Sequence, residues 1–271
     1  MAKFDIINAA GNAYQTSWAA RRYLLRLAIV PVALKLLCFT LATMYATGGD
    51  GHEGNYILFM LIMVPALLAE GWMLSHYVRF IVLGQTWPFR PTGDIEADRA
   101  MLSTRARGIL SGAIMYVLIN MAIGLLSDFA MRVMGPYVSM DGTVNPENIP
   151  PAIPMLSIVL MIGMFMGFRL LWVYIPFALN MEIKPYLHAL RGVSGALALI
   201  GTWLLCFVPF VLVMKFVGPV FAAIPGGAGV FLVTLLSIIL DTCKGIVTTA
   251  GITFGLREVF TRPQGKLDRR V

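Results

Sequence analysis

Charged residues are scarce in this chain of 271 residues: Asp, Glu, Lys and Arg together make up 13% of it. A soluble domain typically carries about 25%. Histidine and cysteine are rare as well, with three residues each. Cys38, Cys206 and Cys243 each lie inside an apolar run, which excludes a disulfide scaffold. The three histidines are isolated and no cysteines are paired, so we expect neither a metal site nor a cofactor.

Catalytic motifs are missing too. Ser111 lies in an apolar run and lacks a histidine at its depth to activate it, so core packing explains it better. The glycines at 226–229 have neither the preceding strand nor the following lysine of a phosphate-binding loop. The sequence therefore predicts a protein that is not an enzyme.

Apolar residues, in contrast, are abundant: they make up 58% of the chain, and the mean hydropathy is +0.79. A membrane-spanning helix needs about 20 apolar residues. Windows of that length predict six spans, at residues 27–45, 56–77, 108–127, 155–178, 193–214 and 228–254. We expect an all-α membrane protein whose single domain is a bundle of six transmembrane helices.

Three segments follow from this prediction: an amphipathic helix at the membrane interface in residues 1–26, the six-helix domain in residues 27–256, and a basic cytoplasmic tail in residues 257–271. The stripe that predicts the interfacial helix recurs at steps of three and four residues and consists of Phe4, Ile7, Gly11, Tyr14 and Trp18. A short amphipathic helix packed on the bundle explains the same stripe nearly as well.

The distribution of Lys and Arg predicts the orientation. Most of the 21 basic residues fall in segments on one side of the predicted spans, whereas the other side has only Arg132 and Lys215. By the positive-inside rule, both termini are cytoplasmic. The net charge of +7 is then explained by contact with anionic lipid headgroups, with no need for a nucleic-acid partner. We expect a multi-pass protein of the bacterial inner membrane.

Five ionisable residues fall inside the predicted spans: Lys35, Glu70, Arg169, Asp241 and Lys244. Each costs roughly 2.5 to 3.5 kcal/mol at the centre of a helix, so we expect them to face the bundle interior and to have partners. Lys35 and Glu70 lie about 12 and 10 Å from the inner ends of neighbouring antiparallel helices. This match in depth predicts an ion pair.

The sixth predicted span carries a polar stripe. Thr234, Ser237, Asp241, Lys244 and Thr248 follow one another at steps of three and four residues, which places them on one helix face. Asn120 gives the third span a polar position of its own. Such a stripe is not expected to face lipid.

Small-xxx-small pairs, in which two glycines lie four residues apart, predict close helix contacts. They occur at Gly108 and Gly112, at Gly163 and Gly167, and at Gly251 and Gly255.

Two functions are compatible with the charged cluster. In the first, it lines a hydrated cavity that binds a small polar or charged solute or lets it permeate. In the second, the charges only fix helix register, and the protein is a structural or accessory protein that organises lipids or a partner complex. The inner loop at residues 84–107, expected to be an ordered interfacial hairpin, and the basic tail would then matter more. The sequence names no protein partner.

Two stretches resemble a pattern in uncharacterised six-helix inner-membrane proteins of bacteria: WMLSHYVRFIVLG at residues 72–84, and Arg169 and Pro176 followed by HALRG at residues 188–192. The residues that match the pattern are His76, Arg79, Gly84, Arg169, Pro176 and Arg191. These proteins are similar to the membrane domain attached to some glycerophosphoryl diester phosphodiesterases. The resemblance implies a fold and a location. It implies no catalytic residues, because this sequence shows no soluble phosphodiesterase domain.

Overall fold

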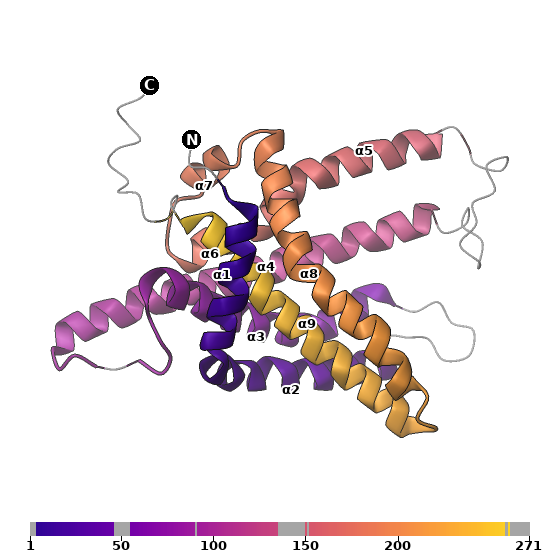
Figure 1. Ribbon diagram of the computed structural model, residues 1–271, viewed down its shortest axis with the longest axis horizontal. Coiled ribbons are helices and arrows are strands. Elements are labelled where there is room, and N and C mark those ends of the chain that lie inside the picture. Colours follow the sequence, from indigo (N-terminus) through magenta and orange to yellow (C-terminus); the bar gives the residue numbers. More distant parts are fainter. Residues whose placement is uncertain are drawn as a thin grey trace.

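A computed structural model describes residues 4–45, 55–89, 91–134, 150, 152–257 and 260 (Figure 1). All regular secondary structure in these residues is helical. The elements are α1 (Ile6–Ala19), α2 (Arg21–Tyr45), α3 (Tyr56–Leu83), α4 (Ile95–Met134), α5 (Ala152–Gly167), the 3-10 helix η3 (Phe168–Trp172), α6 (Tyr174–Ala178), α7 (Ile183–Ala189), α8 (Val193–Ala222) and α9 (Gly227–Gly255). Most of the predicted basic tail lies outside the described residues.

Six helical segments are long and apolar enough to cross a membrane, which confirms that part of the predicted fold. They are Arg21–Tyr45, Tyr56–Leu83, Ile95–Val133, Met155–Ala178, Val193–Ala222 and Gly227–Gly255. Most residues of each apolar stretch lie on the exterior of the bundle. Because soluble monomers rarely expose so much contiguous apolar surface, the exterior fits a multi-pass membrane protein.

The helices pack in neighbouring pairs. α2 packs against α3, α3 against α4, and α8 against α9. The buried core lies where α3, α6, α8 and α9 meet, around Met73, Tyr77, Ile175, Leu199 and Ile252. Figure 1 shows α9 passing diagonally across the bundle beside α8, so that it reaches both the core and the long helices α2 and α3.

α1 packs on the bundle, against α9 and α8. It buries a face of small residues, Ala9, Ala10 and Ala13, whereas Trp18 is exposed. The hydroxyl of Tyr14 donates to the carbonyl of Cys206 at 3.1 Å. Burial is the main reason that the pKa of Tyr14 is raised to about 12. The structure thus has a helix here that packs on the bundle through its alanines and through two residues of the stripe, Phe4 and Tyr14. Its position at the membrane interface stays a prediction. The break before α2 lies at Ala20, inside the predicted segment 1–26.

The polar residues before the third predicted span are helical, which corrects the expected hairpin at residues 84–107. α4 begins at Ile95, because the carboxylate of Asp94 caps it and accepts hydrogen bonds from the N–H groups of Glu96 and Ala97. Asp98 folds back on the preceding turn and accepts hydrogen bonds from the backbone and hydroxyl of Thr92. Gly84 ends α3 in a left-handed conformation, with φ +67°, which glycine adopts without steric cost.

The fourth predicted span is not one continuous helix. α5 ends at Gly167, η3 follows, and α6 begins at Tyr174. Pro176 lies inside α6 and has no N–H for the carbonyl four residues earlier, that of Trp172, so one helical hydrogen bond is missing next to the break. Arg169 lies in η3, and its own carbonyl accepts a hydrogen bond from the Tyr186 hydroxyl at 2.6 Å. A hydropathy window does not detect this break.

Not all of the glycine pairs mediate close packing. A Cβ on Gly112 would lie 2.9 Å from Cβ of Ala178, so α4 and α6 touch there. No atom lies within 4 Å of the corresponding position at Gly163 or Gly167, although that pair has the same spacing. The spacing alone therefore does not identify the packed face.

We predict that Gly112→Leu lowers the free energy of unfolding by about 1 to 3 kcal/mol, because the side chain has no space between α4 and α6. Gly163→Leu is the matched control and should leave stability unchanged or slightly raised, because leucine has the higher helix propensity. Unfolding of the purified protein in detergent, followed by circular dichroism, measures both. Equal losses in the two variants would contradict the assigned contact.

Candidate functional site

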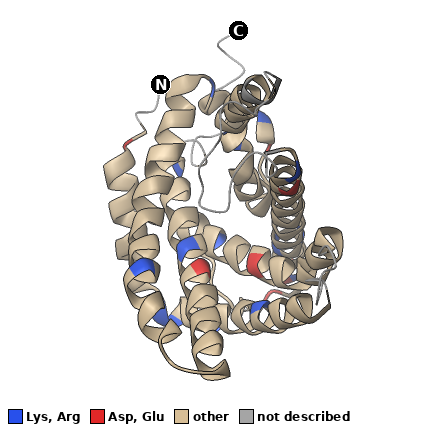
Figure 2. Ribbon diagram, turned by 90° about the vertical axis from the view of Figure 1, so that its right-hand side faces the viewer, with Lys and Arg blue, Asp and Glu red and all other residues tan. Residues whose placement is uncertain are grey.

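Four charged side chains form a continuous chain of ion pairs inside the bundle. Lys35 of α2 is at its centre: its Nζ lies 2.7 Å from Oε1 of Glu70 on α3 and 2.6 Å from Oδ2 of Asp241 on α9. Lys244 binds the other carboxylate oxygen of Asp241. In Figure 2, acidic and basic positions of different helices lie beside one another inside the bundle. The ion pair expected between Lys35 and Glu70 is therefore present.

The two halves of this chain differ in burial. Lys35 and Glu70 are 4% and 3% exposed. The side chains of Asp241 and Lys244 are 44% and 33% exposed. Because burial without a partner is costly for a charge, the inner pair depends on its mutual attraction more than the outer pair does. The four formal charges cancel, so the cluster as a whole carries no net charge.

Aromatic hydroxyls surround the buried carboxylate. The Tyr116 side chain of α4 hydrogen-bonds with Glu70. Its ring packs edge-on against Tyr174 of α6, with centroids 5.3 Å apart, and the Tyr174 hydroxyl lies 2.7 Å from Oγ1 of Thr249. α9 makes room for Glu70 with a glycine, because a Cβ on Gly245 would lie 3.2 Å from Oε1. These contacts hold the carboxylate where α2, α3, α4 and α9 meet.

A cavity of about 720 Å³ lies against the ion-pair chain. Every residue of the predicted polar stripe lines it, and so does the predicted polar position of the third span: Thr234, Ser237, Asp241, Lys244, Thr248 and Asn120. Trp172 also lines it, and the buried indole Nε1 of this residue has no hydrogen-bond partner. The cavity thus offers one accessible carboxylate, one accessible ammonium and several hydroxyls.

The cavity lies along the middle of α9. Its lining follows α9 from Val233 to Thr249, a rise of about 24 Å, with Asp241 midway between them. The lining leaves out the first and the last turns of α9, which spans Gly227–Gly255. Beyond Thr249 the interior is filled, and Ile252 and Leu256 are fully buried in the core.

Arg169 does not belong to the cluster, which corrects the expected set of five. It lies in η3, outside the lining of the cavity, and its buried Nε has no partner. The break in the fourth span moves this residue off the continuous helix on which its depth was counted. A second basic residue of the sequence pattern, Arg191, is exposed between α7 and α8.

The other residues of the sequence pattern gather where α3 ends. Arg79 donates to the carbonyl of Ala178 at 2.7 Å, two residues beyond Pro176, and Gly84 caps the same helix. His76 is buried beside Arg105, with its Nδ1 3.4 Å from a guanidinium nitrogen. The structure thus joins parts of the two stretches, and none of these pattern residues lines the cavity.

Sequence reasoning did not identify Tyr116, Tyr174 and Trp172 as part of the site. Tyr116 lies four residues before Asn120, and the Asn120 amide donates to the Tyr116 carbonyl at 2.8 Å. This i, i+4 spacing places both residues on one helix face and could have identified Tyr116. Tyr174 and Trp172 follow the helix break and carried no periodic signal. Over the described ranges, His, Cys, Asp and Glu do not gather in any group of three or more that could hold a metal ion.

No protein-family model matches this chain, and the searches of curated proteins and of solved structures found no match either. The resemblance of residues 72–84 and 169–192 to a bacterial inner-membrane pattern stays a prediction. The function is therefore inferred from the geometry and chemistry of the cavity.

We predict that Lys35→Met lowers the free energy of unfolding by about 3 to 5 kcal/mol, because Glu70 is left buried without its counter-charge. The double variant Lys35→Met/Glu70→Met should regain most of this loss, since Asp241 keeps Lys244 as a partner. Unfolding by SDS titration in mixed micelles gives both values.

The exposed ion pair of Arg132 and Asp128, 2.9 Å apart on α4, provides the control. Arg132→Met should cost less than about 1 kcal/mol, as is usual for surface pairs. A double variant that loses as much as the sum of its single variants would show that Lys35 and Glu70 do not stabilise each other.

Proposed function

We propose that this protein binds a small polar or charged solute in the cavity beside Asp241 and Lys244, or lets such a solute permeate. The observation that carries the proposal is the difference in burial along the ion-pair chain. A cluster that only fixed helix register would be dry throughout, whereas here the outer half faces a cavity of about 720 Å³. Intramembrane ionisable residues that face a cavity are typical of solute paths.

The ion-pair chain can exchange partners without leaving a buried charge alone. A cationic group of a solute can replace Lys244 on Asp241, and an anionic group can replace Asp241 on Lys244. In either case Lys35 keeps Glu70 at 2.7 Å. The buried pair of Lys35 and Glu70 therefore stays unchanged, and the accessible pair of Asp241 and Lys244 recognises the solute.

The proposed location is the bacterial inner membrane, with both termini in the cytoplasm. The end of α3, the first turns of α4 and the end of α6 lie together, because Arg79 reaches Ala178 and Asn180 reaches the carbonyl of Thr104 at 2.6 Å. Most Lys and Arg residues lie in segments at this end. The positive-inside rule then places it at the cytoplasmic leaflet, next to anionic headgroups, and puts the beginning of α9 on the outer side. In this arrangement, α1 lies at the cytoplasmic interface.

The orientation predicts the outcome of reporter fusions. Green fluorescent protein fused after the last residue should fluoresce, because it folds in the cytoplasm. Alkaline phosphatase fused after Gly226, between α8 and α9, should be active, because that turn lies outside. The reverse pair of results would show that the bundle is inverted.

The cavity predicts which side chains water reaches. Ser237 is exposed and lines the cavity, whereas Ile239, two residues away on α9, is exposed outside it. In a background without the three native cysteines, Ser237→Cys should react with a charged, membrane-impermeant thiol reagent added outside intact cells. Ile239→Cys, which faces hydrocarbon, is the matched control and should not react.

A companion measurement tests the role of the charges. In vesicles containing the purified protein, a panel of small amino acids, amines and carboxylates should include a solute that the protein binds or takes up. Asp241→Leu and Lys244→Leu should lose this activity while remaining folded. If Ser237→Cys were inert, or if both leucine variants kept full uptake, the cluster would serve structure alone.

A further inference from the structure

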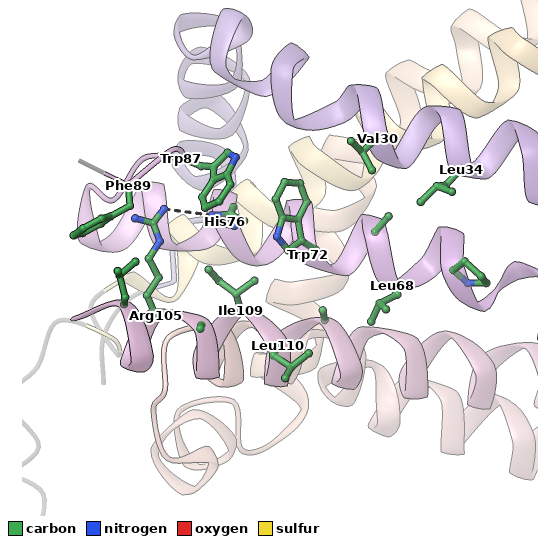
Figure 3. Close-up of a pocket in the computed structure, with 15 residues that line it drawn as sticks. Val30, Leu34, Leu68, Trp72, His76, Trp87, Phe89, Arg105, Ile109 and Leu110 are labelled. Carbon is green, nitrogen blue, oxygen red and sulfur yellow. Dashed lines mark hydrogen bonds between the residues drawn. The ribbon is translucent and has the colours of Figure 1, made fainter. Parts of the chain in front are cut away.

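A second hollow, separate from the cavity, lies between α2, α3 and α4 (Figure 3). It has a volume of about 710 Å³, and most of its lining is aliphatic or aromatic. It reaches the surface of the bundle, since Val30, Leu68 and Leu110 in its walls are exposed. Along α4 it runs from Leu102 to Ala113, about 16 Å. That length matches one leaflet of a hydrocarbon core about 30 Å thick.

One end of this groove is basic. Arg105 lines it and is only 5% exposed. One of its terminal nitrogens donates to the carbonyl of Thr86 at 2.6 Å and lies 3.4 Å from Nδ1 of His76. Its Nε is buried without any partner. In Figure 3 the guanidinium lies beside His76 and Phe89, at the opposite end of the groove from Leu34.

A second buried guanidinium lies nearby. Arg79 is 3% exposed, and it donates to the Ala178 carbonyl and, at 2.9 Å, to the side-chain oxygen of Gln85. Arg79 and Arg105 are close enough to repel each other. Neither forms an ion pair with an Asp or Glu in the described part of the chain. Two like charges out of water need an anion, and no carboxylate of the described residues pairs with either of them.

We propose that the groove binds one anionic phospholipid, with an acyl chain between α2, α3 and α4 and the headgroup phosphate on Arg105. Three features favour a lipid over other anions. The apolar walls continue directly from the cation, the groove opens towards the surrounding bilayer, and Trp72 and Trp87 lie beside His76, as aromatic residues do at a membrane interface. A guanidinium suits a phosphate, because its donors match the phosphate oxygens in pairs.

This site is independent of the cavity. Its lining shares no residue with that of the cavity, and it contains no member of the Lys35 ion-pair chain. The lipid would neutralise the basic end and fill the space between α2 and α4, so that its binding should stabilise the folded protein.

The experiment compares lipid binding by the full chain and by two pairs of variants. The probe is dioleoyl phosphatidylglycerol, titrated into the delipidated protein in a neutral detergent, and the readout is the thermal unfolding midpoint. Arg105→Gln should weaken the apparent affinity about tenfold or more, the loss expected for a charge-assisted hydrogen bond. Arg107→Gln is the control, because Arg107 is exposed on the same helix and lies outside the groove.

The second pair tests the acyl chain. Ala106→Trp fills the groove and should reduce binding, whereas Ala100→Trp, also exposed on α4 but outside the groove, should not. The comparison of Ala106→Trp with Ala100→Trp also keeps the proposal testable if Arg105→Gln fails to fold. Inorganic phosphate alone should give no stabilisation, and phosphatidylcholine should give less than phosphatidylglycerol.

Three results would overturn the proposal. In the first, Arg105→Gln binds phosphatidylglycerol as Arg107→Gln does. In the second, Ala106→Trp binds as Ala100→Trp does. In the third, inorganic phosphate stabilises the protein as much as the lipid, which would indicate a soluble anion as the occupant.

Discussion

Neutralisation of charge in a medium that cannot solvate it is the constraint on which this structure depends. Lys35 satisfies it by binding two carboxylates at once, Glu70 from α3 and Asp241 from α9, so α2, α3 and α9 have to meet at one depth. Gly245 and Tyr116 are consequences of the same requirement, because one leaves space for the carboxylate and the other donates to it. The packing of the bundle around this point follows from electrostatics as much as from apolar contact.

The distribution of charge separates two environments along the bundle. The ion-pair chain carries no net charge and borders the cavity, whereas no carboxylate of the described residues forms an ion pair with Arg79 or Arg105 at the basic end. The first environment suits a guest that exchanges with the solvent, since its charges already have partners. The second suits a resident anion, because its charges lack partners. The bundle thus has two hollows whose charged groups differ in chemistry.

Much of this could be predicted from the sequence, because depth and periodicity act along single helices. The equal depths of Lys35 and Glu70 predicted their pairing, and the steps of three and four residues placed Ser237 with Asp241 on one face. The features that the sequence did not predict depend on contacts between distant segments of the chain. Arg169 was counted on a continuous helix, which η3 interrupts. The roles of Tyr174 and Arg105 depend on partners in other helices, Thr249 and His76. No spacing within one helix reveals such partners.

The alanine face of α1 has a consequence for how firmly that helix is held. Ala9, Ala10 and Ala13 each bury one methyl group, and the specific bonds are those of Tyr14 with Cys206 and of Ser17 with the Tyr77 hydroxyl, 2.8 Å apart. Each buried methyl contributes about 0.8 kcal/mol, far less than a leucine side chain. Small residues therefore let α1 lie close to α8 and α9, and Phe4 and Tyr14 supply the larger apolar contacts that hold it there.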